Sequence, residues 1–204
     1  MDTQWWTTQP QKGLSDLDEF LDKAKDSAEF ELAWGEKVPF KAVDALLVIF
    51  GTNSAANPKK IEGIKVDAKA QSIYFVHMTG WENVGAPSYK FVMNYQDGSK
   101  QELLMESHVN SDDWCAIPPS LSDKNTAVLW KEGATTCGTV DLLVTKWSNP
   151  SADKAIKTID FVSLETAAVP ALFAITLGGA SAAVAPGDKL ATMWSYLKAE
   201  HENP

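Results

Sequence analysis

Arginine is absent from this 204-residue chain, and all 18 of its basic residues are lysines. The arginine guanidinium is the group that grips phosphate or carboxylate through two parallel hydrogen bonds, so that mode of recognition is missing. The 27 acidic residues give a formal net charge of −9, which repels nucleic acids and anionic lipid surfaces. The sequence therefore predicts no nucleic-acid partner, whereas a neutral ligand such as a sugar is compatible with this charge.

Cysteine is scarce, and the beginning of the sequence shows no targeting pattern. Cys115 and Cys137 are the two cysteines, and their spacing fits no zinc motif. Two buried thiols and a disulfide in an exported protein both remain open. The first residues, MDTQWWTTQPQ, have neither the basic nor the apolar region of a signal peptide. This pattern suits either a cytoplasmic protein or a mature or excised part of a larger one.

Catalytic motifs and a membrane-spanning segment are also missing. The sequence contains no GxSxG, no HExxH and no glycine-rich phosphate loop, so we predict that the protein is not an enzyme. The stretch 166–187 carries no charge, but Pro170, Pro186 and many small residues interrupt it. We expect a strand and a loop there and no membrane insertion.

Two segments have helical periodicity. In residues 14–27, Leu14, Leu17 and Leu21 recur at helical spacing, and Ser15 is the expected N-cap. Residues 189–199 predict a second short helix near the end of the chain. We expect a leader and helix over 1–29 that packs on the main domain, and a loop and helix over 181–204.

The sequence between these helices, residues 30–180, predicts about ten short strands. Asp97-Gly98 lies between two of them and is typical of a tight hairpin. In IKTIDFVSL (156–164) the regular alternation begins only at Thr158, so Ile156 is out of phase. No helical segment is available for parallel crossovers, so the pattern indicates an all-β antiparallel sandwich. The expected strands are 30–35, 45–50, 61–68, 72–80, 89–95, 100–106, 127–133, 140–147, 156–164 and 171–177.

A resemblance to a known family begins at about residue 40 and extends to about residue 178. The segments that carry it are FVH (75–77), YKFVMNYQDGSKQELLM (89–105), SDDW (111–114), VTKWSNP (144–150) and AVPALFAIT (168–176). They resemble the galactose-binding-like jelly-roll sandwiches that occur in bacterial polysaccharide-degrading and cell-surface proteins. The resemblance implies a non-catalytic accessory domain, an extracellular or cell-surface location, and a catalytic domain of the same parent protein as a partner.

The resemblance also implies a carbohydrate ligand, and two loops have suitable side chains. Aromatic rings pack on the C–H faces of sugars, while carboxylates and amides bond the hydroxyl groups. The first loop follows the histidine-containing strand, and the second contains the SDDW motif. The candidate ligand-binding residues are Trp81, Glu82, Asn83, Tyr89, His108, Asn110, Asp112, Asp113 and Trp114.

Each candidate also has a structural interpretation. Trp81 and Trp114 could instead cover the end of the core, and His77 is expected to be a core histidine with satisfied hydrogen bonds. We expect no cofactor; a structural calcium ion held by Asn110, Asp112 and Asp113 is the weaker alternative, because their spacing is not that of an EF-hand. A structural or protein-interaction domain is the alternative function, with the same tryptophans as interface anchors.

Overall fold

A computed structural model describes residues 17–41, 47–116, 118–134 and 138–179. One helix, α2 (Asp18–Ala24), precedes a series of antiparallel strands, so the predicted all-β antiparallel architecture is confirmed. The strands are β1 (Ala28–Glu31), β2 (Lys37–Phe40), β3 (Leu47–Val48), β4 (Lys60–Ala68), β5 (Ser72–Gly80), β6 (Pro87–Tyr95), β7 (Lys100–Glu106), β8 (Thr126–Ala134), β9 (Gly138–Ser148), β10 (Ile156–Ser163) and β11 (Val169–Gly178).

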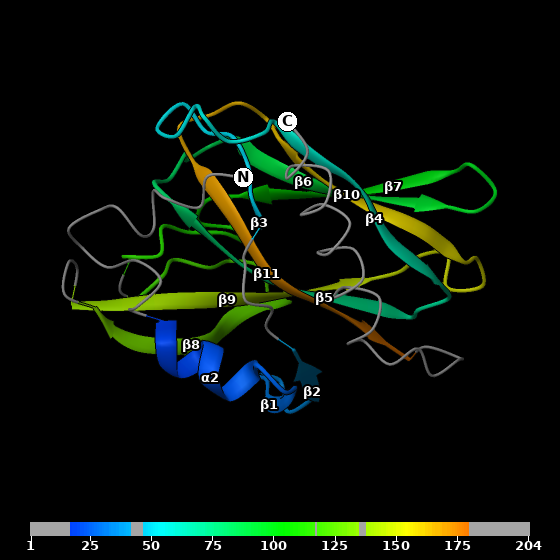
Figure 1. The fold of residues 1–204 in the computed structure, drawn as a ribbon, viewed down its shortest axis with the longest axis horizontal. Coiled ribbons are helices and arrows are strands. Elements are labelled where there is room, and N and C mark those ends of the chain that lie inside the picture. The colour runs from blue at the N-terminus through cyan, green and yellow to red at the C-terminus, as the bar shows by residue number, and fades with distance from the viewer. Residues whose placement is uncertain (1–16, 42–46, 117, 135–137, 180–204) are drawn as a thin grey trace, which may run out of the picture.

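Two sheets lie face to face and form the sandwich (Figure 1). One has the strand order β4-β10-β6-β7, and the other has the order β3-β11-β5-β9-β8. Alternate side chains of both sheets meet between them, and Phe75 of β5 stacks on Phe91 of β6 with ring centroids 4.0 Å apart. We call this apolar layer the inter-sheet core; it includes Ile64, Ile73, Phe75, Tyr89, Phe91, Met93, Ile159 and Phe161.

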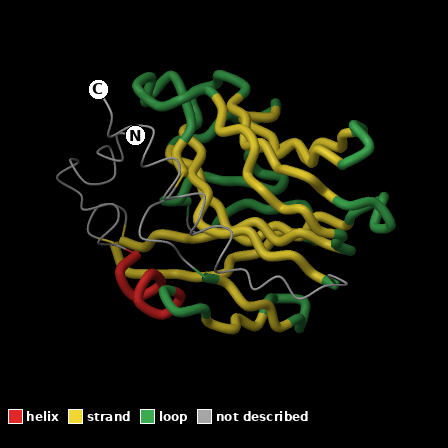
Figure 2. Tube along the Cα trace, turned by 45° about the vertical axis from the view of Figure 1, so that its right-hand side comes forward, coloured by secondary structure: helices red, strands yellow, loops and turns green. Residues whose placement is uncertain are grey.

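The five-stranded sheet is covered on its other face as well. Helix α2 and the β1–β2 hairpin lie against that face (Figure 2). Their side chains form an outer core with the outward residues of the sheet, namely Leu17, Phe20, Phe30, Phe40, Tyr74, Val76, Met78, Val140, Leu142, Val144 and Phe173. Strand β5 is therefore buried on both faces, which explains why its sequence is a continuous apolar run and does not alternate.

The described part of helix α2 covers Asp18–Ala24, within the predicted segment 14–27. Its buried face carries Leu17, Phe20 and Ala24, in agreement with the helical spacing. The backbone amides of Glu19 and Phe20 donate to the carboxylate of Glu132 on β8, at 2.9 and 3.3 Å. A distant carboxylate thus satisfies the start of the helix. The expected cap Ser15 and the predicted helix at 189–199 lie outside the described residues.

The prediction of one strand over 30–35 was wrong. Only Phe30 and Glu31 belong to β1; the chain then turns through Gly35, whose φ is +84°, and returns as β2. The backbone amide of Gly35 donates to the carbonyl of Leu32 at 2.8 Å and closes the turn. The sequence did not predict β2 because this strand contains Pro39, and proline is rare in strands except at edges.

The other strands fall close to their predicted positions. Gly98 has a φ of +87° in the β6–β7 hairpin, as the Asp97-Gly98 pair predicts. Strand β10 has a register shift between Ile156 and Thr158, which brings Ile156 back to the buried face. Trp130 and Trp147 are partly buried against the outer core and the inter-sheet core, respectively. No helix among the described residues is both long enough and apolar enough to cross a membrane.

Candidate functional site

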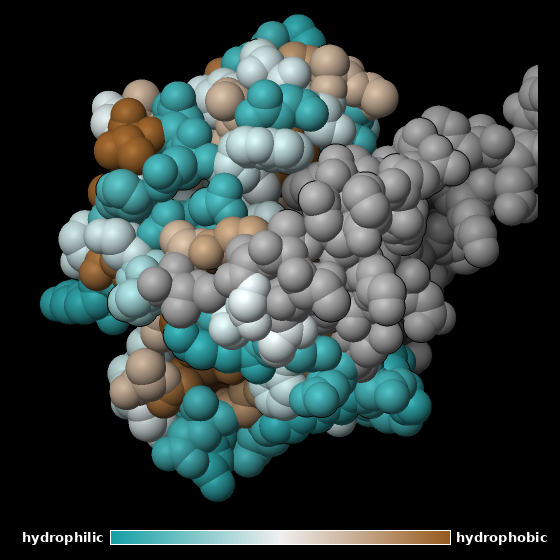
Figure 3. Space-filling model, turned by 90° about the vertical axis from the view of Figure 1, so that its left-hand side faces the viewer, coloured by the Kyte–Doolittle hydropathy of each residue, from teal (hydrophilic) through white to brown (hydrophobic). Residues whose placement is uncertain are grey.

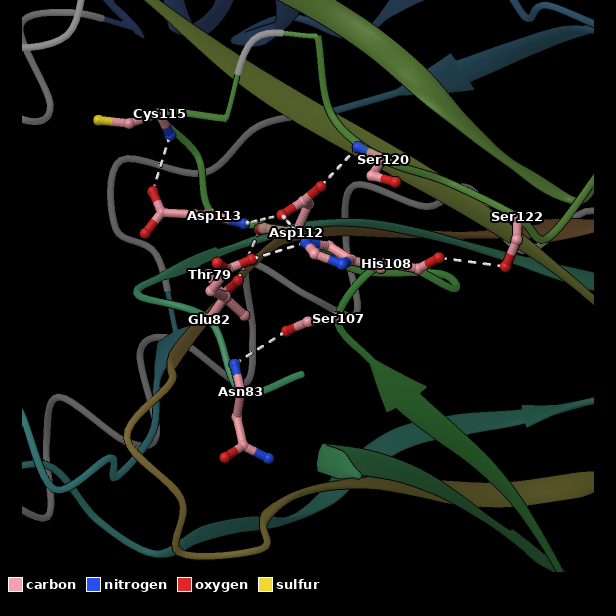
Figure 4. A network of polar contacts seen from close by, with 10 residues as sticks. All are labelled: Thr79, Glu82, Asn83, Ser107, His108, Asp112, Asp113, Cys115, Ser120 and Ser122. Carbon is pink, nitrogen blue, oxygen red and sulfur yellow. Dashed lines mark hydrogen bonds and ion pairs between the residues drawn. The ribbon is translucent and has the colours of Figure 1, made fainter. Parts of the chain in front are cut away.

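Two loops meet at the end of the sandwich where β5 ends and β6 begins. The first contains residues 81–86, and the second contains residues 107–125. Short bridges pair Val84 with Ser107 and Thr79 with Asp113. The backbone amide of Asn83 also donates to the hydroxyl of Ser107 at 3.1 Å (Figure 4). Hydrogen bonds therefore join the two loops into one surface.

Trp81 is held in an uncommon backbone conformation at this end. Its φ is +59°, in the left-handed region, and 39% of the residue is exposed. This conformation costs a non-glycine residue roughly 1–2 kcal/mol. The backbone amide of Trp81 hydrogen-bonds the carboxylate of Asp113, so a half-buried partner from the second loop holds the backbone at Trp81 in place.

The carboxylate of Asp113 has a second backbone partner. Besides Trp81, the backbone amide of Cys115 donates to its carboxylate at 2.8 Å. Burial raises the pKa of Asp113; the neighbouring carboxylates of Glu82 and Asp112 raise it further, and the two amide hydrogen bonds oppose this rise. This carboxylate is therefore occupied by the protein backbone and serves to position the loops.

The side chains of Glu82 and His108 meet across the two loops. Glu82 Oε2 lies 2.8 Å from His108 Nε2, and their side chains are 44% and 41% exposed. His108, like Trp81, has a left-handed backbone, with φ of +67°. Its backbone is fixed on both sides, because its amide donates to the carbonyl of Ser111 at 2.9 Å and its carbonyl accepts from the hydroxyl of Ser122 at 3.1 Å.

Asp112 lies beneath this pair. Its side chain is 1% exposed, and its Oδ1 is 3.9 Å from His108 Nε2. The backbone amides of Asp113 and Ser120 donate to Oδ1 and Oδ2 at 2.8 and 2.6 Å. The carboxylate is therefore buried, fixed in orientation and directed toward the exposed pair (Figure 4).

Only part of the predicted ligand-binding set reaches solvent. Trp81 and Glu82 are exposed, the side chain of His108 is 41% exposed, and Asn83 is half-buried. The described part of this end of the molecule is mostly hydrophilic, with separate hydrophobic areas (Figure 3). The surface at this end is therefore amphipathic, because the aromatic ring of Trp81 lies beside carboxylate, amide and imidazole groups.

The other predicted residues are buried or half-buried. Tyr89 is 0% exposed in the inter-sheet core. A ligand from solvent therefore could not touch it, unlike the exposed residues of the predicted set. Asn110 is buried and closes the turn after β7: its Oδ1 accepts from the amide of Glu106 at 2.8 Å, and its Nδ2 donates to the carbonyl of Leu104 at 2.9 Å. Trp114 packs against the outer core, as in the structural interpretation of this residue.

The arrangement does not favour the weaker calcium hypothesis. The side chain of Asn110 is turned to the backbone of β7 and is used there. It therefore does not join Asp112 and Asp113 in an all-oxygen site. The three described metal-ligating side chains that converge are instead Glu82, His108 and Asp112, with one ligand atom of each within 4.8 Å of the others. The sequence could not predict that these side chains converge, because 25 residues lie between Glu82 and His108 in the chain.

The expectation for His77 is confirmed. It is 0% exposed, and both ring nitrogens are bonded, Nε2 to the hydroxyl of Thr145 at 2.8 Å and Nδ1 to that of Tyr89 at 2.7 Å. Burial lowers its pKa from 6.5 to about 3. The same hydroxyl of Tyr89 lies 3.3 Å from that of Ser111. This network braces the strands behind the site and keeps the imidazole neutral.

Cys115 lies on the second loop beside Asp113 and is disulfide-bonded. The disulfide alternative therefore holds for this cysteine. The chain's other cysteine, Cys137, lies outside the described residues.

Comparisons with protein-family models, curated proteins and solved structures find no match to this chain. The fold and the chemistry of the two loops are therefore what indicates its function.

Proposed function

We propose that this protein is a non-catalytic carbohydrate-binding module on a jelly-roll sandwich. The observation that carries the proposal is the exposed Trp81, which lies beside Glu82 and Asn83 at the loop end of the sandwich and whose backbone amide is bonded to Asp113. Loops on rigid scaffolds commonly carry binding residues. The exposed polar groups there are the types that hydrogen-bond sugar hydroxyls.

The strand order supports the jelly-roll assignment. A jelly roll has eight strands in two four-stranded sheets formed by two Greek keys. Here β3-β11-β5-β9 faces β4-β10-β6-β7, and β8 extends the first sheet at its edge. The first and last strands of this set are thus neighbours, as in a sheet that is rolled up from a long hairpin.

The chemistry of recognition follows from the exposed groups. The ring of Trp81 packs on the apolar C–H face of a pyranose. Glu82 accepts hydrogen bonds from hydroxyls, and the side-chain amide of Asn83 both donates and accepts. Each hydroxyl must lose water before it is bound, so affinity at one site is modest, and attachment to a larger protein strengthens it through avidity. The disulfide at Cys115 supports an oxidising, extracellular location.

A second candidate function is a protein-interaction domain attached to a glycan-active or surface protein. The observation that favours it is the exposure of Val84, at 59%, in the same loop as Trp81. Two apolar side chains on one loop suit the centre of a protein interface.

Affinity electrophoresis against a panel of polysaccharides tests the proposal and separates the two candidates. The proteins are the wild type, Trp81→Ala, and Leu104→Ala as a control for an exposed apolar side chain on β7, 48% exposed. We expect at least one glycan to retard the wild type and the control, with affinity for Trp81→Ala lower by at least about tenfold, or about 1.4 kcal/mol. No retardation by any glycan would contradict sugar binding and favour the protein-interaction domain.

A further inference from the structure

We propose that Glu82, His108 and Asp112 form a binding site for a divalent transition-metal ion, and that zinc is the best-matched ion. The site joins the two loops at the end of the sandwich. It does not depend on the proposed sugar ligand, since it uses an exposed carboxylate, an exposed imidazole and a buried carboxylate of the chain itself.

The separations of the three ligand atoms suit one small ion. His108 Nε2 is 2.8 Å from Glu82 Oε2 and 3.9 Å from Asp112 Oδ1, and one ligand atom from each of the three residues lies within 4.8 Å of the others. In a tetrahedral zinc site with bonds of about 2.0–2.1 Å, neighbouring ligand atoms lie roughly 3.4 Å apart. The side-chain ends of Glu82 and His108 are exposed, so side-chain rotations that move their ligand atoms by about 1 Å bring these atoms to that spacing.

Asp112 supplies the rigid part of the site. Backbone amides of Asp113 and Ser120 orient its two oxygens, and the hydroxyl of Thr79 donates to its backbone carbonyl at 2.6 Å. Each carboxylate oxygen has a second lone pair, so these amide bonds leave Oδ1 able to coordinate. Hydrogen bonds of this type around a metal ligand fix its orientation and raise affinity.

His108 is equally well placed. Its left-handed backbone is anchored by Ser111 and Ser122, and this arrangement directs its imidazole nitrogen toward both carboxylates. The local charge also favours a cation, because no lysine in the described part of the chain forms an ion pair with Glu82 or Asp112. The two carboxylates that converge on this imidazole place negative charge where a divalent ion can neutralise it.

The type of ligand selects the type of metal. Calcium and magnesium prefer sites made wholly of oxygen, whereas imidazole suits zinc, copper and nickel. Three protein ligands complete a tetrahedron with one water molecule or one ligand oxygen. Glu82 follows Trp81 directly in the chain, so the ion would clamp the loop that carries this ring to the second loop.

Isothermal titration of the metal-free protein with zinc chloride tests the site, with no glycan present. The decisive variants are His108→Asn, because asparagine tolerates a left-handed backbone, and Glu82→Gln. The matched controls are His201→Gln, a histidine outside the described residues, and Glu102→Gln, an exposed carboxylate on β7 that pairs with Lys90 at 2.7 Å. Circular dichroism checks that each variant is folded.

We expect one zinc ion per chain for the wild type and both controls, and an affinity at least tenfold weaker for His108→Asn and Glu82→Gln. Calcium chloride should bind the wild type at least tenfold more weakly than zinc. Unchanged zinc affinity in folded His108→Asn, loss of binding in His201→Gln, or no zinc binding by the wild type would each overturn the proposal. Because sugar binding is measured separately by gel retardation, failure of this site leaves the carbohydrate proposal testable on its own.

Discussion

The buried imidazole of His77 should make the protein less stable in mild acid. Burial lowers its pKa from 6.5 to about 3, so the folded state holds it neutral while the unfolded chain takes up a proton below pH 6.5. The stabilisation is therefore present above pH 6.5 and is lost as the pH falls toward 3. Linkage predicts that the free energy of unfolding is lower at pH 5.0 than at pH 7.5 by about 2 kcal/mol from this residue alone.

Urea unfolding at the two pH values measures this effect, with tryptophan fluorescence as the signal. The perturbation is His77→Gln, which keeps hydrogen-bonding groups but cannot titrate. Wild type should lose about 2 kcal/mol more stability between pH 7.5 and 5.0 than the variant does. All other titrating groups are common to both proteins and cancel in this difference.

Equal losses of stability in the two proteins would refute the reasoning, since they would show that His77 has a similar pKa folded and unfolded. Should the variant fail to fold, the ring signals of His77 in wild-type NMR spectra give the same test. They should keep the shifts of the neutral form at pH 5.0, and a protonated ring in the folded protein at that pH would contradict the burial argument.

Two further changes test the packing of the sandwich at Gly51 and the polar bonds that Glu36 accepts. Gly51→Ala would place a Cβ 2.1 Å from the carbonyl oxygen of Ala168, whereas a Cβ at Gly133 would meet nothing within 4 Å. Urea unfolding should therefore show that Gly51→Ala lowers the free energy of unfolding by about 2–4 kcal/mol, and that Gly133→Ala lowers it by less than about 1 kcal/mol. Equal losses of stability in the two variants would contradict the close approach at Gly51. Glu36→Gln weakens the acceptor of bonds from Lys146 at 2.6 Å and Tyr74 at 2.9 Å, so stability at pH 7 should fall by about 1 kcal/mol. The hydrogen bond from Lys146 lowers the pKa of Glu36, so this difference should shrink as the pH falls below 4.5, and a constant difference would refute its origin in the charge.

Much of the sandwich could be predicted from local patterns. Asp97-Gly98 identified a hairpin because the turn needs a positive φ, which Gly98 supplies. The apolar run of β5 identified a strand, but its burial on both faces depends on α2 and the β1–β2 hairpin, which pack there through tertiary contacts. The capping of α2 by Glu132 likewise joins residues more than 100 positions apart, and no local pattern encodes such a contact.

The candidate site was predictable only in its location. Loop composition correctly placed Trp81 and Glu82 at the surface. It could not separate them from Tyr89, because an aromatic residue at the start of a strand faces solvent or core according to register, and here it faces the inter-sheet core. The pairing of Glu82 with His108 arises where two loops cross, so it became visible only in three dimensions.

The most direct test of the central proposal is the mobility of wild type and Trp81→Ala in gels that contain the glycans of the panel, with both proteins shown to be folded. Sugar binding through the loop surface predicts that one glycan retards the wild type and that the same glycan leaves Trp81→Ala nearly unretarded. Equal retardation of the two proteins would contradict the assignment of the site to Trp81, and the absence of retardation by every glycan would contradict carbohydrate binding itself.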